Sequence, residues 1–438
     1  MSKIRSFKGG MHPEYDGKEL TAGCSVVDAP LFEKYYVILA ENAGRPPKPC
    51  VAKGDKVCKY QQIAEADGFV SAHLHAPVSG TVEGIVEVPG PMGGNVQAVV
   101  IASDGEERGE PPFECWENWQ EKSGGELMTR IREAGIVGMG GAAFPSHVKL
   151  SVPPGKKVDT LIINGAECEP YLTADHRLMA EQPRKIVIGA AIMGKIINVS
   201  NIVIGVEENK PDAIAALEAA CAGTSVRVQV LAARYPQGAE KQLIYAVTGR
   251  CVPSGGLPFD AGCVVQNTGS AAAVYDAVLL GIPLIERVVT VSGEAVKRPG
   301  NFRLRIGTPV IEAVKLAGGI TEEPGKLILG GPMMGFAQRS FEVPIAKNTS
   351  GVLLLPPGRA LNFSSAPCIR CGRCVEVCPM KLTPCLLCAA IEGGRFDLAL
   401  KGHVMDCLEC GACAYVCPSR RPLVQQFRRA KSELRKKK

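Results

Sequence analysis

Two cysteine runs near the C-terminal end of the sequence have the same spacing, C-x2-C-x2-C-x3-C-P. The first contains Cys368, Cys371, Cys374 and Cys378, and the second contains Cys407, Cys410, Cys413 and Cys417. In proteins with this pattern, three thiolates of a run bind one [4Fe–4S] cluster and the fourth binds the other cluster. Zinc is the alternative, but zinc sites use paired C-x2-C units with longer gaps. The spacing therefore predicts two [4Fe–4S] clusters, with Cys417 completing the ligands of the first and Cys378 those of the second.

The cysteines outside the two runs carry weaker signals. Cys385 and Cys388 lie between the runs, and we expect them to be buried apolar side chains rather than further ligands. Residues 1–10 contain no apolar segment of a secretory signal, so disulfides are not expected. The same apolar role is expected of Cys24, Cys50, Cys58, Cys115, Cys221, Cys251 and Cys263.

Length and charge exclude several classes of protein. The chain has 438 residues, 46% hydrophobic and 21% charged, which indicates about three folded domains rather than disorder. Its longest stretch without a charged residue is 88–103, shorter than the roughly 20 apolar residues of a spanning helix. The net charge of +6 arises from residues 420–438, and the rest of the chain is slightly acidic. No basic surface for nucleic acid is therefore expected.

The last residues, 424–438, have the pattern of a basic amphipathic helix. Val424, Phe427, Ala430 and Leu434 recur at helical spacing with basic residues around them. Such a helix suits an anionic lipid surface or an acidic partner, and each basic residue near a membrane contributes about 1 kcal/mol. The pattern predicts a docking helix, and the alternative is a disordered terminus.

Hydrophobic patterning divides the rest of the chain. Residues 1–112 are rich in short β-branched runs, and both 51–57 and 76–82 predict a strand, a turn and a strand. A linker over 113–126 precedes 127–285, where helical segments alternate with buried strands. That alternation predicts an α/β layer. The predicted buried strands are 161–163, 202–204 and 226–231.

The region 286–355 returns to strands, including 288–291, with one helix. Thr308 and Pro309 predict its capped start, and Gly318 and Gly319 its end. Residues 360–423 then form the cysteine-rich helical module.

A glycine-rich loop occupies 135–145, with four glycines within 135–141. Backbone amides free of side chains can close around a phosphate or a flat ring. The loop contains G-x-G-x-x-A, but 128–134 is predicted as helix rather than strand, so a Rossmann assignment is not favoured. Lys149 offers a cation to a phosphate; taken alone, it would be a surface lysine.

Polar residues follow the strand 161–163. Asn164, Glu167 and Glu169 come after it, at the carboxyl edge where α/β proteins bind ligands. Acceptors there suit ribose hydroxyls or a nicotinamide amide, although an ordinary polar exit from a strand is the alternative. Similar edges follow at 204–208 and at 264–269, which contains Asn267 and Thr268.

Together these signals resemble the flavin- and NADH-binding subunit of respiratory complex I. The loop is similar to that family's Gly-Arg-Gly-Gly-Ala-Gly-Phe-Pro segment, and Asn164 to Glu169 match its Asn-x-Asp-Glu-x-Glu-Pro segment. The resemblance implies that Asn164 and Glu167 hold non-covalent FMN. It also implies that Phe144, Lys149 and Glu169 contact NAD(H). The complete predicted cofactor-binding set is Gly138, Gly140, Gly141, Ala142, Phe144, Lys149, Asn164, Glu167, Glu169, Glu240, Asn267 and Thr268.

Four positions depart from the complex I pattern. Met139 replaces the loop arginine, and Ala143 replaces a glycine. Ala166 replaces an aspartate that contacts FMN, and Ala239 replaces the first acid of a Gly-Glu-Glu turn. These departures concern the surroundings of the flavin rather than the cysteine runs.

The order of the regions resembles the RnfC family, the flavin-domain subunits of Rnf complexes. That family begins with a segment like 7–13, followed by a barrel-sandwich hybrid of biotinyl/lipoyl type, a flavin domain, a β-grasp (SLBB-like) domain and a two-cluster ferredoxin module. In this sequence no lysine lies between Lys59 and Lys122, so the sandwich is expected to be a scaffold rather than an acylated carrier. His73 and His75 are expected to be structural or surface residues.

The resemblance implies a peripheral subunit on the cytoplasmic face of the membrane. It would exchange a hydride between NAD(H) and FMN and pass single electrons to partner subunits, including a ferredoxin-like one, without a catalytic side chain. The alternatives are a soluble flavo-iron–sulfur protein like cobalamin reductase, and a cluster-bearing scaffold without catalysis.

Overall fold

The apolar runs of the central region form a parallel four-stranded sheet, which confirms the predicted α/β layer. The computed structural model describes residues 4–360, 362–364 and 366–436. The strand order is β11-β10-β9-β12, with all neighbours parallel. These strands are β9 (Thr160–Gly165), β10 (Asn201–Glu207), β11 (Val226–Leu231) and β12 (Cys263–Asn267). Both faces are buried, since Leu161 and Ile163 belong to one apolar cluster and Ile162 to another.

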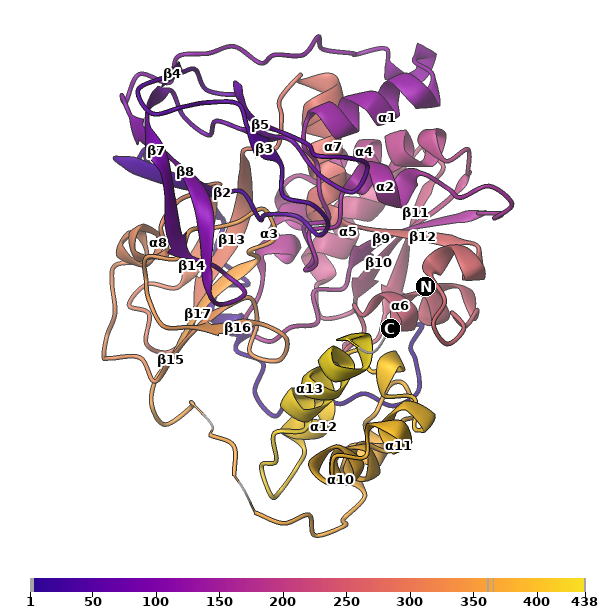
Figure 1. Cartoon of the computed structure of the whole chain (residues 1–438). Coiled ribbons are helices and arrows are strands. Elements are labelled where there is room, and N and C mark those ends of the chain that lie inside the picture. Colours follow the sequence, from indigo (N-terminus) through magenta and orange to yellow (C-terminus); the bar gives the residue numbers. More distant parts are fainter. Residues whose placement is uncertain (1–3, 361, 365, 437–438) are drawn as a thin grey trace.

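Helices cover both faces of this sheet (Figure 1). They are α1 (Gly124–Glu133), α2 (Ser146–Leu150), α3 (Ala174–Glu181), α4 (Pro183–Ile196), α5 (Pro211–Cys221), α6 (Glu240–Thr248) and α7 (Thr268–Leu279). Helices α1, α4 and α7 contact one another, while α6 packs Leu243 and Ile244 against the opposite face. Helix α1 begins three residues before the predicted boundary, because Ser123 and Glu126 form a capping box.

The N-terminal part contains two small antiparallel sheets. One has the order β2-β8-β7-β4 and the other β3-β5-β6. Their strands are β2 (Lys34–Ile38), β3 (Lys48–Pro49), β4 (Lys56–Val57), β5 (Gln62–Glu65), β6 (Leu74–His75), β7 (Gly80–Pro89) and β8 (Asn95–Ser103). The predicted strand before Gly54 is wrong. The Ala52 N–H donates to the Asp55 carboxylate at 2.8 Å, and this local turn takes the place of a strand.

A six-stranded mixed sheet follows, with the order β1-β14-β13-β17-β15-β16. Its members are β1 (Val26–Asp28), β13 (Glu286–Ser292), β14 (Gly300–Arg305), β15 (Lys326–Leu329), β16 (Phe336–Gln338) and β17 (Gly351–Leu355), packed against α8 (Val310–Leu316). The predicted Thr308 cap of this helix is wrong. Pro309 is the N-cap residue, and the Thr308 hydroxyl donates to the carbonyl oxygen of Arg305 at 2.7 Å.

The last part is a small helical module, drawn in yellow and light orange in Figure 1. It contains α9 (Arg373–Glu376), α10 (Pro384–Glu392), α11 (Phe396–Lys401), α12 (Ala412–Tyr415) and α13 (Leu423–Lys436). Among the described residues, four 3-10 turns complete the secondary structure: η1 (Lys18–Leu20), η2 (Trp119–Glu121), η3 (Pro258–Ala261) and η4 (Val404–Asp406). Within the described part of the chain, no helix is long and apolar enough to span a bilayer.

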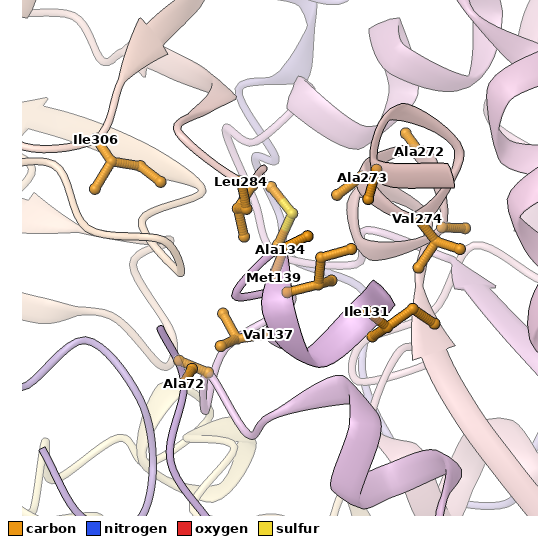
Figure 2. Close-up of a cluster of buried hydrophobic side chains, with 14 of the residues drawn as sticks. Ala72, Ile131, Ala134, Val137, Met139, Ala272, Ala273, Val274, Leu284 and Ile306 are labelled. Carbon is orange, nitrogen blue, oxygen red and sulfur yellow. The ribbon is translucent and has the colours of Figure 1, made fainter. Parts of the chain in front are cut away.

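One apolar core is continuous between the N-terminal part and the α/β part. Figure 2 shows its centre, where Ala72 from the N-terminal part approaches Val137 at the start of the glycine loop. Met139 lies there beside Ala134 and Leu284, and it is only 5% exposed. The residue that replaces the loop arginine of complex I is therefore part of the core.

Candidate functional site

The glycine loop is fixed at its base and open at its tip. The Gly138 N–H donates to the carbonyl oxygen of Phe144 at 2.8 Å, which closes the loop on itself. The Met139 N–H donates to the Ser270 hydroxyl at 3.0 Å, which ties the loop to α7. Residues 140–142 are exposed, and a Cβ added at Gly141 would meet no atom within 4 Å. The loop follows α1 rather than a strand, so it differs from a Rossmann turn as predicted.

Gly140 and Asn267 form the contact between this loop and the sheet edge. A Cβ added at Gly140 would lie 3.2 to 3.4 Å from the Asn267 side chain. Asn267 is the N-cap of α7, and its Oδ1 accepts from the Gly269 N–H at 2.8 Å. Its Nδ2 donates to Asp175 at 2.8 Å. The structure therefore brings Gly140 and Asn267 together, two residues that are far apart in the sequence.

Two carboxylates lie at the same sheet edge. The Glu167 carboxylate accepts from the backbone N–H groups of Asp175 and His176 at 2.7 and 2.9 Å, so it caps α3. Burial, and then the neighbouring Glu167 charge, raise the pKa of Asp175 to about 6. The adjacent Thr268 is fully buried. Asp175 was not predicted, because its role depends on Asn267 rather than on any local motif.

Two lysines that were not predicted stabilise the segment after β9. Lys18 Nζ donates to the carbonyl oxygens of Glu167, Glu169 and Leu172 at 2.5 to 2.9 Å. Lys210 Nζ donates to the carbonyl oxygen of Ala166 at 2.7 Å and pairs with Glu207 at 3.0 Å. The segment needs this support because Glu167 has a left-handed φ of 47°. Lone lysines at distant sequence positions gave no signal of this role.

Asn164 lies opposite the turn that precedes α6. Its Nδ2 donates to the carbonyl oxygen of Gly238 at 2.8 Å, and its Oδ1 accepts from the Ala166 N–H at 3.2 Å. The neighbouring residue in the turn, Gln237, is fully buried, and neither polar atom of its amide has a hydrogen-bond partner among the described residues. Buried amides without partners are rare in proteins. This edge can therefore supply further donors and acceptors to a polar ring such as that of a flavin.

Lys149 and Glu240 form an ion pair at the rim, with 2.9 Å between Nζ and Oε1. Both side chains are partly exposed, and Glu240 is the first residue of α6. Phe144 is half-buried at the base of the loop, just before the start of α2, the helix that carries Lys149. Two residues of the predicted set are thus joined directly, at a place accessible to an anionic ligand.

Glu169 lies in a different environment. Its carboxylate accepts from the backbone N–H groups of Met333 and Met334 at 3.1 and 2.9 Å, and it lies 3.4 Å from the Tyr235 hydroxyl. Burial raises its pKa to about 7, although the two backbone N–H groups lower it. Glu169 therefore joins the α/β part to the loop between β15 and β16. The structure shows no contact between Glu169 and Lys149, the two residues assigned together to NAD(H).

The cysteine runs line two separate cavities. The first, of about 430 Å³ including its open mouth, has Cys368, Cys371, Cys374 and Cys417 in its wall. The second, of about 360 Å³ including its own open mouth, has Cys378, Cys407, Cys410 and Cys413. Each cavity thus takes three cysteines from one run and the fourth from the other, which is the arrangement that cross-ligation requires.

The thiols in these cavities suit a polyatomic cluster better than a single ion. A zinc site would hold its sulfurs about 3.8 Å apart, given Zn–S bonds of about 2.3 Å. Among the residues that the structure describes, no three Cys, His, Asp or Glu side chains converge closely enough to hold one ion. Burial raises the pKa of the Cys410 thiol to about 12, and bonding to a metal centre would keep this thiol deprotonated.

Cys385 and Cys388 also border the first cavity. Cys388 is 1% exposed, as expected of an apolar side chain, whereas Cys385 is only partly buried. Burial, and then the adjacent Cys385 thiol, raise the pKa of the Cys374 thiol to about 11. Both cysteines lie on the wall of the first cavity, and their interpretation as plain apolar side chains does not account for this position.

The predicted docking helix is present as α13, but its apolar side is already covered. Phe427 and Ala430 are buried in the core of the cysteine-rich module, and Leu434 packs against that core. Lys431 and Arg428 form ion pairs with Glu409 at 2.7 and 2.9 Å. The prediction that this apolar stripe docks on a membrane or a partner is therefore wrong, because the stripe is buried in the chain's own cysteine module. Lys437 and Lys438, which belong to the predicted tail, lie outside the described residues.

Comparisons with known proteins agree with this arrangement. Residues 5–106 match the RnfC barrel sandwich hybrid domain, and residues 131–276 match the Nuo51 FMN-binding domain. Residues 288–337 match the SLBB domain, and residues 360–418 match a 4Fe-4S dicluster domain. The predicted fold class is thereby confirmed, and so are FMN and [4Fe–4S] clusters as the cofactors of these domains.

Two bacterial relatives align with almost the whole chain. The C subunit of the proton-translocating ferredoxin:NAD(+) oxidoreductase complex of Clostridium ljungdahlii is 50% identical over 431 residues, which cover 98% of this chain and 94% of that protein. The C subunit of the Na(+)-translocating ferredoxin:NAD(+) oxidoreductase complex of Acetobacterium woodii is 46% identical over 433 residues, covering 99% and 98%.

A solved structure shares the fold. An NAD+-reducing [NiFe]-hydrogenase has a TM-score of 0.52 and 19% identity, over 73% of this chain and 64% of that chain. An FMN-binding α/β domain joined to a dicluster module defines an oxidoreductase subunit of the flavo-iron–sulfur class. Within that class, the chain belongs to the RnfC family, the C subunits of the ion-translocating ferredoxin:NAD+ oxidoreductases.

Proposed function

We propose that this chain exchanges electrons between NAD(H) and partner subunits of a membrane-bound, ion-translocating complex. The observation that carries the proposal is a contact between the α/β part and the second cysteine cavity. It is made by Tyr235, which lies just before the turn opposite Asn164. The Tyr235 hydroxyl donates to the carbonyl oxygen of Cys410 at 2.6 Å and also contacts Glu169. Bound FMN would supply the conversion between hydride and single-electron chemistry, which cysteine-bound clusters can then accept.

The chain's own residues are proposed to bind the flavin and the dinucleotide and to orient them. In the proposal, the open tip of the glycine loop and the polar edge at Asn164 and Asn267 hold the flavin. The Lys149–Glu240 pair lies at the rim, where Lys149 can meet a dinucleotide phosphate, and Phe144 lies beside it. Glu167 holds the start of α3 in place, and Lys18 holds the segment around Glu167. The assignment of Glu169 to NAD(H) stays a prediction, since both of its oxygens already accept hydrogen bonds.

The two cavities support an order for the electrons. Two contacts of the α/β part lie at residues that line the second cavity: the Tyr235 hydroxyl donates to the carbonyl oxygen of Cys410, and Gln242 Nε2 donates to that of Pro379 at 3.2 Å. Cys368 and Cys371 at the first cavity are exposed. The second cavity is therefore proposed to serve the flavin, and the first to serve the partner.

The proposed partner is a ferredoxin-like subunit of the same complex. The relatives are named as subunits of proton- and Na+-translocating ferredoxin:NAD+ oxidoreductase complexes. We propose that this chain lies peripherally on the cytoplasmic face of the membrane, where NAD(H) is available. Exposed Ile369, at 65% exposure beside the first cavity, offers an apolar contact for the partner.

Anaerobic purification followed by titration with NADH tests the proposal. We expect FMN and about eight irons per chain, and bleaching of the flavin by NADH alone. Lys149→Ala should raise the NADH concentration needed for half bleaching while flavin and iron stay constant. Its effect on stability should remain below about 1 kcal/mol, because the ion pair is partly exposed. A fall in flavin content with unchanged NADH affinity would mean that Lys149 contacts the flavin rather than NAD(H).

A further inference from the structure

The two cysteine cavities have the same sequence spacing but differ in their surroundings. The cavity of the second set contains no cysteine among its lining residues other than Cys378, Cys407, Cys410 and Cys413. The first cavity has two more, Cys385 and Cys388, both from α10. Three residues apart on a helix, these two side chains lie on the same side. One cavity thus has spare thiols and the other has none.

The two spare thiols are not equivalent. The Cys388 thiol donates to Glu392 at 3.5 Å and accepts from Arg421 at 3.7 Å, and Arg421 also pairs with Glu392. Cys388 therefore already has polar partners in Glu392 and Arg421. Among the described residues, no comparable ion pair is seen at Cys385, and this thiol adjoins that of Cys374. It belongs to the first turn of α10 and lines the first cavity together with Cys374.

We propose that Cys385 is a reserve ligand for the cluster in the first cavity and can bind the iron that Cys374 serves. In this exchange the Fe–S bond to Cys374 breaks and one to Cys385 forms. The Cys385 thiol gives its proton to water and the released Cys374 thiolate takes one up, so no electron moves. The inference rests on the proposed ligand sets. It gives the solvent-exposed cluster a means of surviving damage to Cys374, which the enclosed cluster lacks.

The matched runs provide the test, with the full-length chain purified anaerobically. Cys374→Ala and Cys413→Ala remove the same position of each run. We expect Cys374→Ala to keep the iron and sulfide content of the unaltered chain, and Cys413→Ala to lose about half. The double variant Cys374→Ala/Cys385→Ala should fall to the level of Cys413→Ala, whereas Cys374→Ala/Cys388→Ala should stay full. Electron paramagnetic resonance of reduced Cys374→Ala should show one altered cluster signal.

Flavin content checks that each variant is folded. Loss of about half the iron in Cys374→Ala alone, with flavin retained, would overturn the reserve-ligand role while leaving the proposed ligand sets intact. Full iron in Cys374→Ala/Cys385→Ala would overturn both, because the cavity would then not need either thiol. If Cys374→Ala lost its flavin, reconstitution of the unaltered chain and of Cys385→Ala after oxygen exposure would decide. Equal recovery of iron in the two would overturn the proposal.

Discussion

Gly140 is placed where no side chain fits without a shift. The Asn267 side chain lies 3.2 Å from the position of a Cβ at Gly140, and Asn267 holds both the cap of α7 and Asp175. We expect Gly140→Val to displace Asn267 and to abolish FMN binding. Flavin absorbance after gel filtration measures the loss.

The matched control for this variant is Gly23→Val, since a Cβ at Gly23 meets no atom within 4 Å. It should retain flavin. Stoichiometric FMN in Gly140→Val would place the flavin away from this loop and sheet edge.

Asp175 makes the stability of the α/β part depend on pH. Its pKa in the fold is about 6, above the roughly 3.9 of an unfolded aspartate, so the folded state binds more protons between these values. Stability is therefore lost as pH rises from about 4 to 6, by about 2 to 3 kcal/mol. Asp175→Asn removes this loss and keeps an acceptor for Asn267. Its midpoint of thermal unfolding should exceed that of the unaltered chain at pH 7.5.

The difference between the two proteins should shrink when the same unfolding experiment is made at pH 5. A constant difference at both values would mean that titration of Asp175 is not its cause. An elevated pKa beside a candidate flavin edge is also the kind of perturbation that accompanies functional sites.

At the scale of elements, α13 is a structural part of the cysteine module. Phe427 is 1% exposed and shares a core with Leu387 and Ile391 of α10, which also carries Cys385 and Cys388. Phe427→Ala should cost about 3 to 5 kcal/mol and release iron. Iron per chain after desalting is the measurement. Arg435→Glu, an exposed change on the same helix, should keep its iron, and equal losses in both would contradict a core role for Phe427.

The sequence predicts those elements that are determined by a local pattern of residues. Apolar runs indicated β9, β10 and β11, and cysteine spacing indicated which residues line the two cavities. The apolar stripe of α13 was also recognised, but the pattern alone does not say whether a membrane, a partner or the same domain covers it. The stripe is covered by its own domain, because α10 presents a matching apolar side.

Long-range contacts account for the rest of what sequence reasoning missed. Strand β1 pairs with β14, far away in the sequence, with Val26 opposite Asn301. Lys18 reaches three carbonyl groups near Glu169. A strand of three residues and a single lysine have no periodicity or spacing to detect. Only the assembled fold determines where they bind.

At the scale of the whole molecule, the proposed order of the two cavities can be tested. Cys371→Ala should remove the exposed cluster, and Cys410→Ala the enclosed one. With NADH, we expect the remaining cluster of Cys371→Ala to be reduced rapidly. In Cys410→Ala the flavin should still bleach while the remaining cluster is reduced more slowly, because its path from the flavin is longer. Rapid-freeze electron paramagnetic resonance measures both rates, and equal rates would contradict the order.

The contact between the N-terminal segment and the cysteine module also determines when this segment can be fully buried during synthesis. Met11 exchanges backbone hydrogen bonds with Tyr235 at 2.8 and 2.9 Å, and both belong to one buried cluster with Cys410. The Gly10 N–H also donates to the carbonyl oxygen of Val377. At about 5 to 20 residues per second, a ribosome adds the roughly 400 residues between Met11 and Cys410 in about 20 to 80 seconds. During that interval the first segment can pair with Tyr235 but has no partner in the cysteine module, so its burial is completed only after Cys410 has been synthesised.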